Sequence, residues 1–167
     1  MPAPLDPFCL FQVLGAHEVD YVLIGGLAAV LRGSPAMTND ADIMPAPGAA
    51  NLARLSAALT DLEARIRSHT DPDGIPFDPH PALLDSMATL NTTTRCGDFD
   101  VAFAPAGVAG FAELRAASDL YDLAGQSVPV AALEDIIRSK EAAGRPKDHA
   151  NLPILYALRE EIERDKS

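Results

Sequence analysis

The sequence predicts an α/β (α+β) protein, with a small mixed sheet flanked by helices and a helical C-terminal portion. Three observations predict this class. An apolar, β-branched run ends in Gly25-Gly26, as a buried strand followed by a turn would. The segments "NDADIMP" and "GDFDVAF" alternate acidic and apolar residues with the period of a strand. Apolar residues recur at helical spacing between and after these segments, so helices and strands are intermixed.

With 167 residues, of which 48% are hydrophobic, the chain is long enough for one domain with a substantial core. We expect a single domain over 1–167. Within it, 1–105 would contain the glycine turn and an acidic core. The remainder, 106–167, would be mostly helical and carry a basic cluster.

Each expected strand is rich in apolar or β-branched residues and is bounded by Gly, Pro or Asp. We expect strands at 20–26 and 39–45, a hairpin of 92–95 with 98–103, and short strands within 121–132. Each expected helix has apolar residues at helical spacing. We expect helices at 7–16, 27–32, 49–66, 82–90, 108–117 and 132–144, and one from Pro146 nearly to the C-terminus. Pro153 should kink or divide this last helix, because proline removes a backbone hydrogen bond.

Two cysteines, Cys9 and Cys96, fit neither the spacing of a metal site nor a disulfide framework. We expect both to be small buried hydrophobic residues in a reducing cytoplasm. No apolar run is long enough to span a bilayer, and the N-terminus lacks the basic and apolar regions of a signal peptide. The sequence therefore predicts a cytoplasmic protein without a membrane partner.

The charge of the chain is strongly negative and unevenly distributed. The net charge of −11 argues against a general nucleic-acid coat protein, because phosphate binding needs a positive surface. Residues 1–130 hold 6 basic and 16 acidic side chains, whereas residues 131–167 hold 7 and 8. The positive charge of the second part is concentrated in four residues: Arg138, Lys140, Arg145 and Lys147.

Two aspartates, Asp40 and Asp42, lie two residues apart on an expected strand. Their side chains would point to the same face, with Cα atoms about 6.5–7 Å apart. Two like charges resist burial unless a positive group pairs with them, and a divalent metal ion does so. In two-metal phosphoryl transfer a third carboxylate usually comes from a neighbouring strand, and Asp98 and Asp100 are the candidates. The alternative reading of an isolated DxD pair is a solvated edge strand.

The glycine turn offers a place for phosphate groups. A strand followed by Gly25-Gly26 and a helix leaves free backbone N–H groups at the helix start, where phosphate oxygens bind. The missing Cβ atoms also let a triphosphate approach the backbone closely. A tight turn alone would equally explain the glycines, and "IGGLAAVLRG" matches neither a Walker loop nor a dinucleotide fingerprint.

The order of these features resembles the nucleotidyltransferase fold of the DNA polymerase β superfamily. The matching features are a strand, "GG", a short helix, "GSP", "TNDAD" on a strand and "DFD" on a further strand. Within that superfamily the chain is similar to the AbiEii-type and MenT-type nucleotidyltransferase toxins, because "VPVAALEDIIRSKEAAGRPKDHANL" (128–152) looks like their C-terminal signature. The resemblance covers about 20–152 and has little support from 50–90.

The resemblance implies a role for each matching residue of the acidic part. Gly25 and Gly26 would hold the triphosphate. Asp40 and Asp42 would bind two Mg²⁺ ions, with Mn²⁺ as an alternative. Asp100, favoured over Asp98, would complete the metal site and help to deprotonate the acceptor hydroxyl.

The resemblance also implies roles for polar residues around these acids. Lys140 would contact the nucleotide phosphates, Arg145 and Lys147 would hold phosphates or the acceptor strand, and Asp148 would orient Lys140 or Arg145. The alternative is a solvated helix end with weak local ion pairs.

Two hydroxyl groups precede the first aspartate. Ser34 and Thr38 would lie beside the nucleotide, where the Thr38 hydroxyl would bond a phosphate or cap the strand. In some toxins of this kind the antitoxin modifies such a hydroxyl, and a phosphate on Thr38 would repel the incoming triphosphate.

The function that the resemblance implies is a metal-dependent nucleotidyltransferase toxin of a toxin–antitoxin system. It would transfer NMP from a pyrimidine NTP (CTP or UTP) to the 3′ end of tRNA and so block translation. Its partners would be the NTP, the tRNA acceptor end and a cognate antitoxin. Three alternatives stay open: an antibiotic-modifying nucleotidyltransferase acting on an aminoglycoside or lincosamide hydroxyl, a non-catalytic nucleotide-binding module, and an antitoxin-like minimal nucleotidyltransferase acting on a protein.

Overall fold

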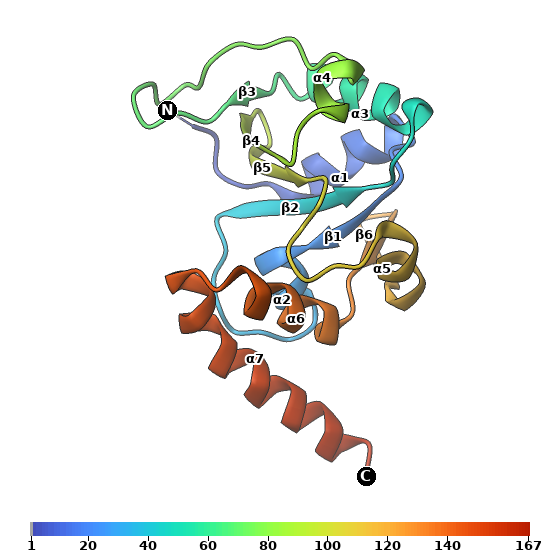
Figure 1. Ribbon diagram of the computed structural model, residues 1–167, viewed down its shortest axis with the longest axis vertical. Helices are drawn as coiled ribbons and strands as arrows, with labels where there is room; N and C mark the ends of the chain where they lie inside the picture. Colours follow the sequence, from blue (N-terminus) through green and yellow to red (C-terminus); the bar gives the residue numbers. More distant parts are fainter. Residues whose placement is uncertain (1) are drawn as a thin grey trace.

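The computed structural model describes residues 2–167, which contain one seven-stranded mixed sheet (Figure 1). The strands lie in the order β3-β4-β5-β2-β1-β7-β6. Their bounds are β1 (Tyr21–Ile24), β2 (Asp40–Pro45), β3 (Arg65–Ile66), β4 (Thr89–Thr94), β5 (Gly97–Ala102), β6 (Asp119–Leu123) and β7 (Gln126–Val130). The predicted α/β class with a mixed sheet is confirmed.

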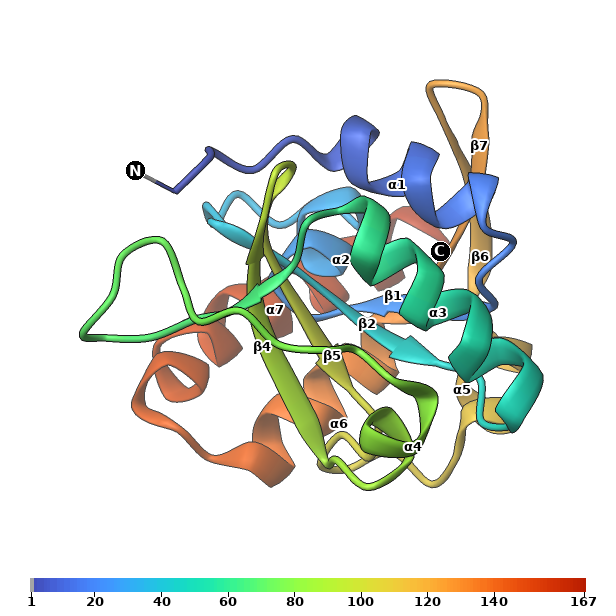
Figure 2. The ribbon, with the colours of Figure 1, turned by 90° about the horizontal axis from the view of Figure 1, so that it is seen from above.

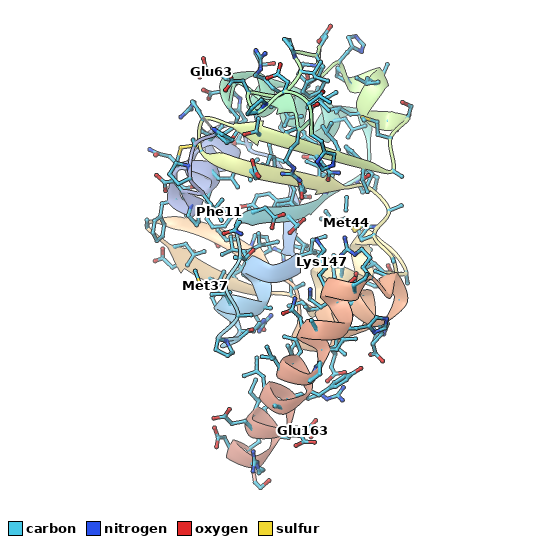
Figure 3. All side chains as sticks on the ribbon, turned by 90° about the vertical axis from the view of Figure 1, so that its left-hand side faces the viewer. Phe11, Met37, Met44, Glu63, Lys147 and Glu163 are labelled. Carbon is cyan, nitrogen blue, oxygen red and sulfur yellow. A yellow bond between two sulfur atoms is a disulfide. The ribbon has the colours of Figure 1, made fainter. Side chains whose placement is uncertain are left out.

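Helices cover both faces of this sheet. Their bounds within the described residues are α1 (Pro7–Ala16), α2 (Gly25–Leu31), α3 (Ala49–Asp61), α4 (Pro81–Asp85), α5 (Phe111–Ala117), α6 (Leu133–Ala143) and α7 (Pro146–Asp165). Helices α3 and α4 lie on one side of the sheet, and α2, α6 and α7 lie on the other (Figures 1 and 2). The second half of α7 extends beyond the rest of the molecule, with Glu163 near its end (Figure 3).

The neighbouring strands β2 and β5 separate the core from a polar face. Ala41 and Ile43 of β2 are fully buried, as are Phe99 and Val101 of β5, because these alternate side chains pack into the hydrophobic core. The acidic residues between them point to the opposite face. The two strands run parallel, so that their acidic positions fall at the same level of the sheet.

Arg32, which directly follows α2, connects this helix to the end of β7 and to β6. Its guanidinium donates to the carbonyls of Val130 (2.9 Å) and Ala131 (3.0 Å) and pairs with Asp119 (2.7 Å). The guanidinium also lies over the ring of Tyr121. The end of β7 and the start of α6 are therefore held beside α2.

Tertiary pairing overrides local helix propensity at two expected helices. The helix expected at 49–66 ends at Asp61, because Arg65 and Ile66 pair with β4 as the short strand β3, which the sequence did not predict. The helix expected at 82–90 is reduced to α4, because β4 begins at Thr89 and pairs with β5. Strand pairing, a long-range interaction, is not visible in the local sequence.

Pro153 does not divide the last helix. Helix α7 runs without interruption from Pro146 to Asp165. Pro153 lies at an exposed position, where solvent can satisfy the carbonyl that loses its helical partner.

Cys9 on α1 and Cys96 in the β4–β5 turn form a disulfide, so the expectation of two unpaired cysteines is wrong. The two residues are 87 positions apart in the sequence, and only the fold brings their Cα atoms to 5.7 Å. The segment before α1 contacts the same turn, because the backbone N–H of Asp6 donates to the carbonyl of Cys96 (2.8 Å). Gly97, with φ of +105°, leaves the space that Leu5 occupies. The N-terminal segment and the start of β5 are thus held together.

No helix among residues 2–167 combines the length and the apolar character that crossing a bilayer would require.

The disulfide gives a direct test of this part of the fold. Cys9→Ser should lower the free energy of unfolding by about 2–4 kcal/mol, because the bond closes a long loop of the unfolded chain. Thiol titration of the denatured, unreduced wild-type protein should find no free thiol. The double variant Cys9→Ser/Cys96→Ser should be about as stable as either single variant. Two free thiols in the wild-type protein would contradict the disulfide.

Candidate active site

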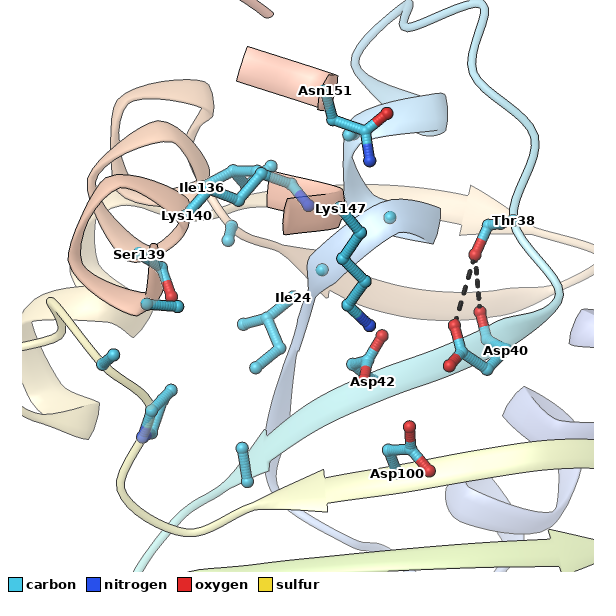
Figure 4. A pocket seen from close by; sticks show the side chains of 18 of the residues that line it. Ile24, Thr38, Asp40, Asp42, Asp100, Ile136, Ser139, Lys140, Lys147 and Asn151 are labelled. Carbon is cyan, nitrogen blue, oxygen red and sulfur yellow. Dashed lines mark hydrogen bonds between the residues drawn. The ribbon is translucent and has the colours of Figure 1, made fainter. Parts of the chain in front are cut away.

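Three carboxylates meet on the polar face of the sheet. Asp40 and Asp42 come from β2 and Asp100 from β5, where the parallel register places Asp42 directly opposite Asp100 (Figure 4). Each of the three offers a carboxylate oxygen, and these oxygens lie within 4.8 Å of one another. A cluster of carboxylate oxygens is the donor set that Mg²⁺ and Mn²⁺ prefer, so the three residues fit a divalent metal ion.

The crowding of these acids changes their titration. Burial, together with the negative charges of Asp40 and Asp100, raises the pKa of Asp42 to about 7. The pKa of Asp100 is raised to about 6, because burial and the charge of Asp40 outweigh the opposing effect of Arg67. A divalent cation would relieve the same repulsion while keeping the carboxylates ionised.

The carboxylates lie in a cavity of about 560 Å³ between the sheet and the C-terminal helices. Ten of the eleven residues assigned to the site from the sequence line it: Gly25, Gly26, Ser34, Thr38, Asp40, Asp42, Asp100, Lys140, Arg145 and Lys147. Asp148 is the exception and lies fully buried behind the cavity wall. The fold therefore brings together segments that lie up to about 120 residues apart in the sequence.

Gly25 lies against the carboxylate of Asp42. Its φ of +71° belongs to the left-handed region, which a side chain would strain. A Cβ atom there would also lie 2.5 Å from Oδ2 of Asp42. The site thus requires glycine at the end of β1, both for the turn and for the close approach of backbone to carboxylate.

The two hydroxyls before β2 have separate local roles. The buried Ser34 hydroxyl accepts a hydrogen bond from the backbone N–H of Ala36 (3.2 Å). The Thr38 hydroxyl is within reach of the backbone carbonyl (3.1 Å) and the side-chain Oδ1 (3.4 Å) of Asp40 (Figure 4). Thr38 therefore lies beside the first carboxylate, and it faces Gly26 across the turn.

Asp148 connects two of the cations. Its carboxylate lies 2.7 Å from Nε of Arg145 and 3.6 Å from Nζ of Lys140, whose side chain is only 13% exposed. The Asp148 carboxylate also accepts a hydrogen bond from the backbone N–H of Arg145 (3.2 Å) at the start of α7. Burial alone would raise the pKa of Asp148, but the hydrogen bonds from Arg145 lower it below its ordinary value. The buried carboxylate is thus ionised and fixes the corner between α6 and α7.

Lys147 extends from the first turn of α7 toward the acids. Its ammonium points at Asp42 (Figure 4), and its positive charge lowers the pKa of that residue more than the charge of Lys140 does. The sequence pattern favours Lys140 and Arg145 over Lys147 as site residues, whereas in the structure it is Lys147 that points at the carboxylates (Figure 4).

Asp98 and Asp100 occupy different positions relative to the cavity. Asp100 lines the cavity, whereas Asp98 does not. Arg67, which the sequence analysis did not identify, pairs with Oδ1 of Asp100 (2.7 Å) and Oδ2 of Asp98 (3.3 Å). Arg67 follows the unpredicted strand β3, so its placement depends on a pairing that no local pattern signals.

Three polar, uncharged residues that the sequence analysis missed also line the cavity. They are Asn91 on β4, Ser139 on α6 and Asn151 on α7. Isolated Asn and Ser residues carry no spacing pattern, so only the three-dimensional arrangement reveals them.

No protein-family model and no curated protein sequence matches the chain. Solved structures, however, match it along most of its length. The lincosamide antibiotic adenylyltransferase LnuA, solved with lincomycin bound, is 14% identical, with a TM-score of 0.59 over 93% of this chain and 99% of LnuA. ANT(2″)-Ia, in complex with adenylyl-2″-tobramycin, is 16% identical, with a TM-score of 0.54 over 95% of both chains. An antigenic nucleotidyltransferase-like protein from Paracoccidioides brasiliensis is 19% identical, with a TM-score of 0.54 over 93% of this chain and 78% of that one. The chain therefore has the nucleotidyltransferase fold.

The raised pKa of Asp42 predicts a pH-dependent change in stability. In the folded protein Asp42 titrates near 7, against about 3.9 in the unfolded chain, so between pH 4 and 7 the folded state binds more protons. The protonated Asp42 carboxyl therefore stabilises the folded state fully below about pH 4, and this stabilisation is lost as the pH rises through 7. In EDTA, Asp42→Asn should match wild type in free energy of unfolding near pH 4 and exceed it at pH 8, by on the order of 4 kcal/mol.

Urea unfolding of both proteins at pH 4, 6 and 8 measures this difference. Glu163→Gln, which removes an exposed carboxylate near the end of α7, serves as the control and should show no comparable pH-dependent gain. A pH-independent difference between Asp42→Asn and wild type would contradict the crowded arrangement of the acids.

Proposed function

We propose that this protein is a metal-dependent nucleotidyltransferase toxin, which transfers NMP from an NTP to the 3′ end of tRNA and is controlled by a cognate antitoxin. The observation that carries the proposal is the meeting, in one cavity, of three carboxylates within 4.8 Å, a glycine turn and three cationic side chains. A solvated pair of aspartates on an edge strand would need neither the third carboxylate nor the glycine turn and the cationic side chains. A non-catalytic module would not need three carboxylates at the cost of mutual repulsion.

Opposite charges are arranged across the cavity as the reaction requires. The carboxylates of Asp40, Asp42 and Asp100 lie on the sheet, while Lys140 and Lys147 reach in from the C-terminal helices (Figure 4). In the proposed complex these lysines hold the triphosphate, and the Gly25-Gly26 turn allows it to approach the backbone. Their positive charge binds the donor nucleotide and opposes the charge that develops on the leaving pyrophosphate.

Asp40, Asp42 and Asp100 would hold the divalent metal. When bound, Mg²⁺ or Mn²⁺ supplies Lewis-acid stabilisation of the phosphate oxygens. The acceptor hydroxyl oxygen forms a bond to the α-phosphorus, and the bond between that phosphorus and the oxygen bridging to the β-phosphate breaks. Pyrophosphate leaves, and Asp100 accepts the proton of the attacking hydroxyl.

The choice of a tRNA acceptor rests on the toxin resemblance and on the cations at the α6–α7 corner. Arg145, which has a 58% exposed side chain at the cavity, and Lys147 would contact phosphates of the acceptor end. The resemblance assigns a pyrimidine nucleotide as donor. It also makes Thr38 the candidate for antitoxin control, because a phosphate there would lie beside Asp40 and Gly26.

Two observations favour a second candidate, an antibiotic hydroxyl as acceptor. The similarity to the lincosamide adenylyltransferase spans 93% of this chain and 99% of that one. The net charge of −11 suits a cationic drug better than a polyanion. The donor side and the carboxylates would act identically, and only the acceptor would differ.

Transfer of radioactive label tests both candidates. Purified protein incubated with each α-³²P-labelled NTP, Mg²⁺ and total tRNA should label tRNA on a denaturing gel. EDTA and Asp42→Ala should each abolish the label, because either removes the metal site, while circular dichroism should show that the variant is folded. Label that appears on lincomycin or tobramycin but not on tRNA would select the second candidate. No label on any acceptor with any NTP would overturn the proposal.

Lys140→Ala should weaken NTP binding more than it slows chemistry. Loss of one charge-assisted phosphate contact should raise KM for NTP about 10-fold or more and leave kcat within about threefold. Steady-state kinetics over a range of NTP concentrations measure this split, with Lys166→Ala, beyond the last turn of α7, as the matched control. Unchanged NTP dependence in Lys140→Ala would remove this residue from the donor site.

A further inference from the structure

Arg67 is the one cation that contacts the carboxylate cluster from the sheet side within the described residues. It comes after β3, at the edge of the sheet opposite the C-terminal helices. Its guanidinium lies 2.7 Å from Oδ1 of Asp100 and 3.3 Å from Oδ2 of Asp98. It therefore joins the two acids of β5, of which only Asp100 lines the cavity.

The position of the Arg67 guanidinium is fixed from several directions. Besides the two carboxylates, it donates to the backbone carbonyl of Thr92 (3.2 Å). The backbone N–H of Arg67 donates to the carbonyl of Asn91 (3.0 Å), so both ends of the residue are held by β4. The side chain is 33% exposed and that of Asp100 only 15%, unlike a solvated pair at a surface. A planar guanidinium with three fixed acceptors imposes an orientation on each of them.

The contact with Arg67 leaves one carboxylate oxygen of Asp100 available to a metal ion. A carboxylate has two oxygens, and Arg67 occupies Oδ1. The side chain of Asp100 still directs an oxygen toward Asp42 (Figure 4), which is where a metal shared by the three acids would lie. Asp98 has the opposite character, because one of its oxygens is buried without a hydrogen-bond partner and the other contacts Arg67.

We propose that Arg67 is a positioning residue for the third carboxylate: its guanidinium holds one oxygen of Asp100, with Asp98 and the Thr92 carbonyl as anchors, so that the other oxygen serves as metal ligand. This proposal rests on the metal-dependent reaction proposed above. It assigns different tasks to the two acids of β5, with Asp100 as ligand and Asp98 as anchor of the arginine. Residues that hydrogen-bond to a metal ligand without contacting the metal orient that ligand and affect both metal affinity and turnover.

Metal binding tests the proposal without any substrate. Titration of the nucleotide-free protein with Mn²⁺, followed by electron paramagnetic resonance, should show about 10–100-fold weaker binding for Arg67→Ala than for wild type. Arg67→Lys should resemble Arg67→Ala, because a single ammonium cannot replace the planar fork on both carboxylates. Asp98→Asn should weaken binding less than Arg67→Ala, and Asp100→Asn should weaken it most.

Arg65→Ala is the matched control. Arg65 lies two residues earlier, and its guanidinium donates to the carbonyl of Gly74, away from the carboxylates. This variant should bind Mn²⁺ as wild type does. Thermal unfolding of every variant identifies any loss of folded protein, and only variants folded at the temperature of the titration are compared.

Kinetics provide a second readout once transfer is detected. Arg67→Ala should lower kcat about 10–100-fold with KM for NTP within about threefold, because the lost contact orients the acceptor side and not the donor. Methylguanidinium added to Arg67→Ala should restore part of the rate, whereas methylammonium should not.

The outcomes separate this proposal from the proposed function. If no transfer is found but Arg67→Ala loses Mn²⁺ affinity, the function is wrong and the positioning role stands. If transfer is found and Arg67→Ala keeps wild-type affinity and kcat, the positioning role is wrong. Arg67→Lys with wild-type behaviour would also overturn it, since charge alone would then suffice. Failure of the wild-type protein to bind Mn²⁺ would overturn both.

Discussion

Repulsion among three carboxylates is the constraint on which the rest of this site depends. Asp40, Asp42 and Asp100 are held together by the parallel register of β2 and β5, although burial and mutual charge oppose their ionisation. The opposite faces of the same strands bury Ala41, Ile43, Phe99 and Val101, and this apolar packing holds the strands in place. The apolar packing of the core thus offsets the destabilisation that the crowded acids cause.

The cations around these acids are placed by interactions of their own. Arg67 is hydrogen-bonded to β4, Lys140 is paired with the buried Asp148, and Lys147 lies in the first turn of α7, beside the Arg145–Asp148 ion pair. None of them forms a close ion pair with Asp40 or Asp42 in the structure, so these two remain free to bind a metal. The cluster is therefore bordered by positive charge on both sides but is not neutralised by it.

Local sequence pattern predicted the parts of the site that depend on local geometry. The alternation in "NDADIMP" and "GDFDVAF" correctly placed the acids on one face of each strand, and the glycines at the end of β1 mark a real turn. The pattern could not predict the register between β2 and β5, the strand β3, Arg67 or the Cys9–Cys96 bond, because each depends on contacts between distant segments. The predicted length of the helix that begins at Ala49 was wrong for the same reason, since strand pairing of Arg65 and Ile66 outweighs helix propensity.

The parallel pairing of β2 with β5 also has a kinetic consequence for the growing chain. Asp42 and Asp100 are separated by almost 60 residues, and Lys140 and Lys147 follow a further 40 or more residues later. Contacts of such long range form slowly, because a large loop must close before they gain stability. Until α6 and α7 have left the ribosome, the cavity beside the three carboxylates lacks one of its walls. A partly made copy that ends before α6 and α7 therefore lacks Lys140 and Lys147, and the cavity is complete only once both helices have been made.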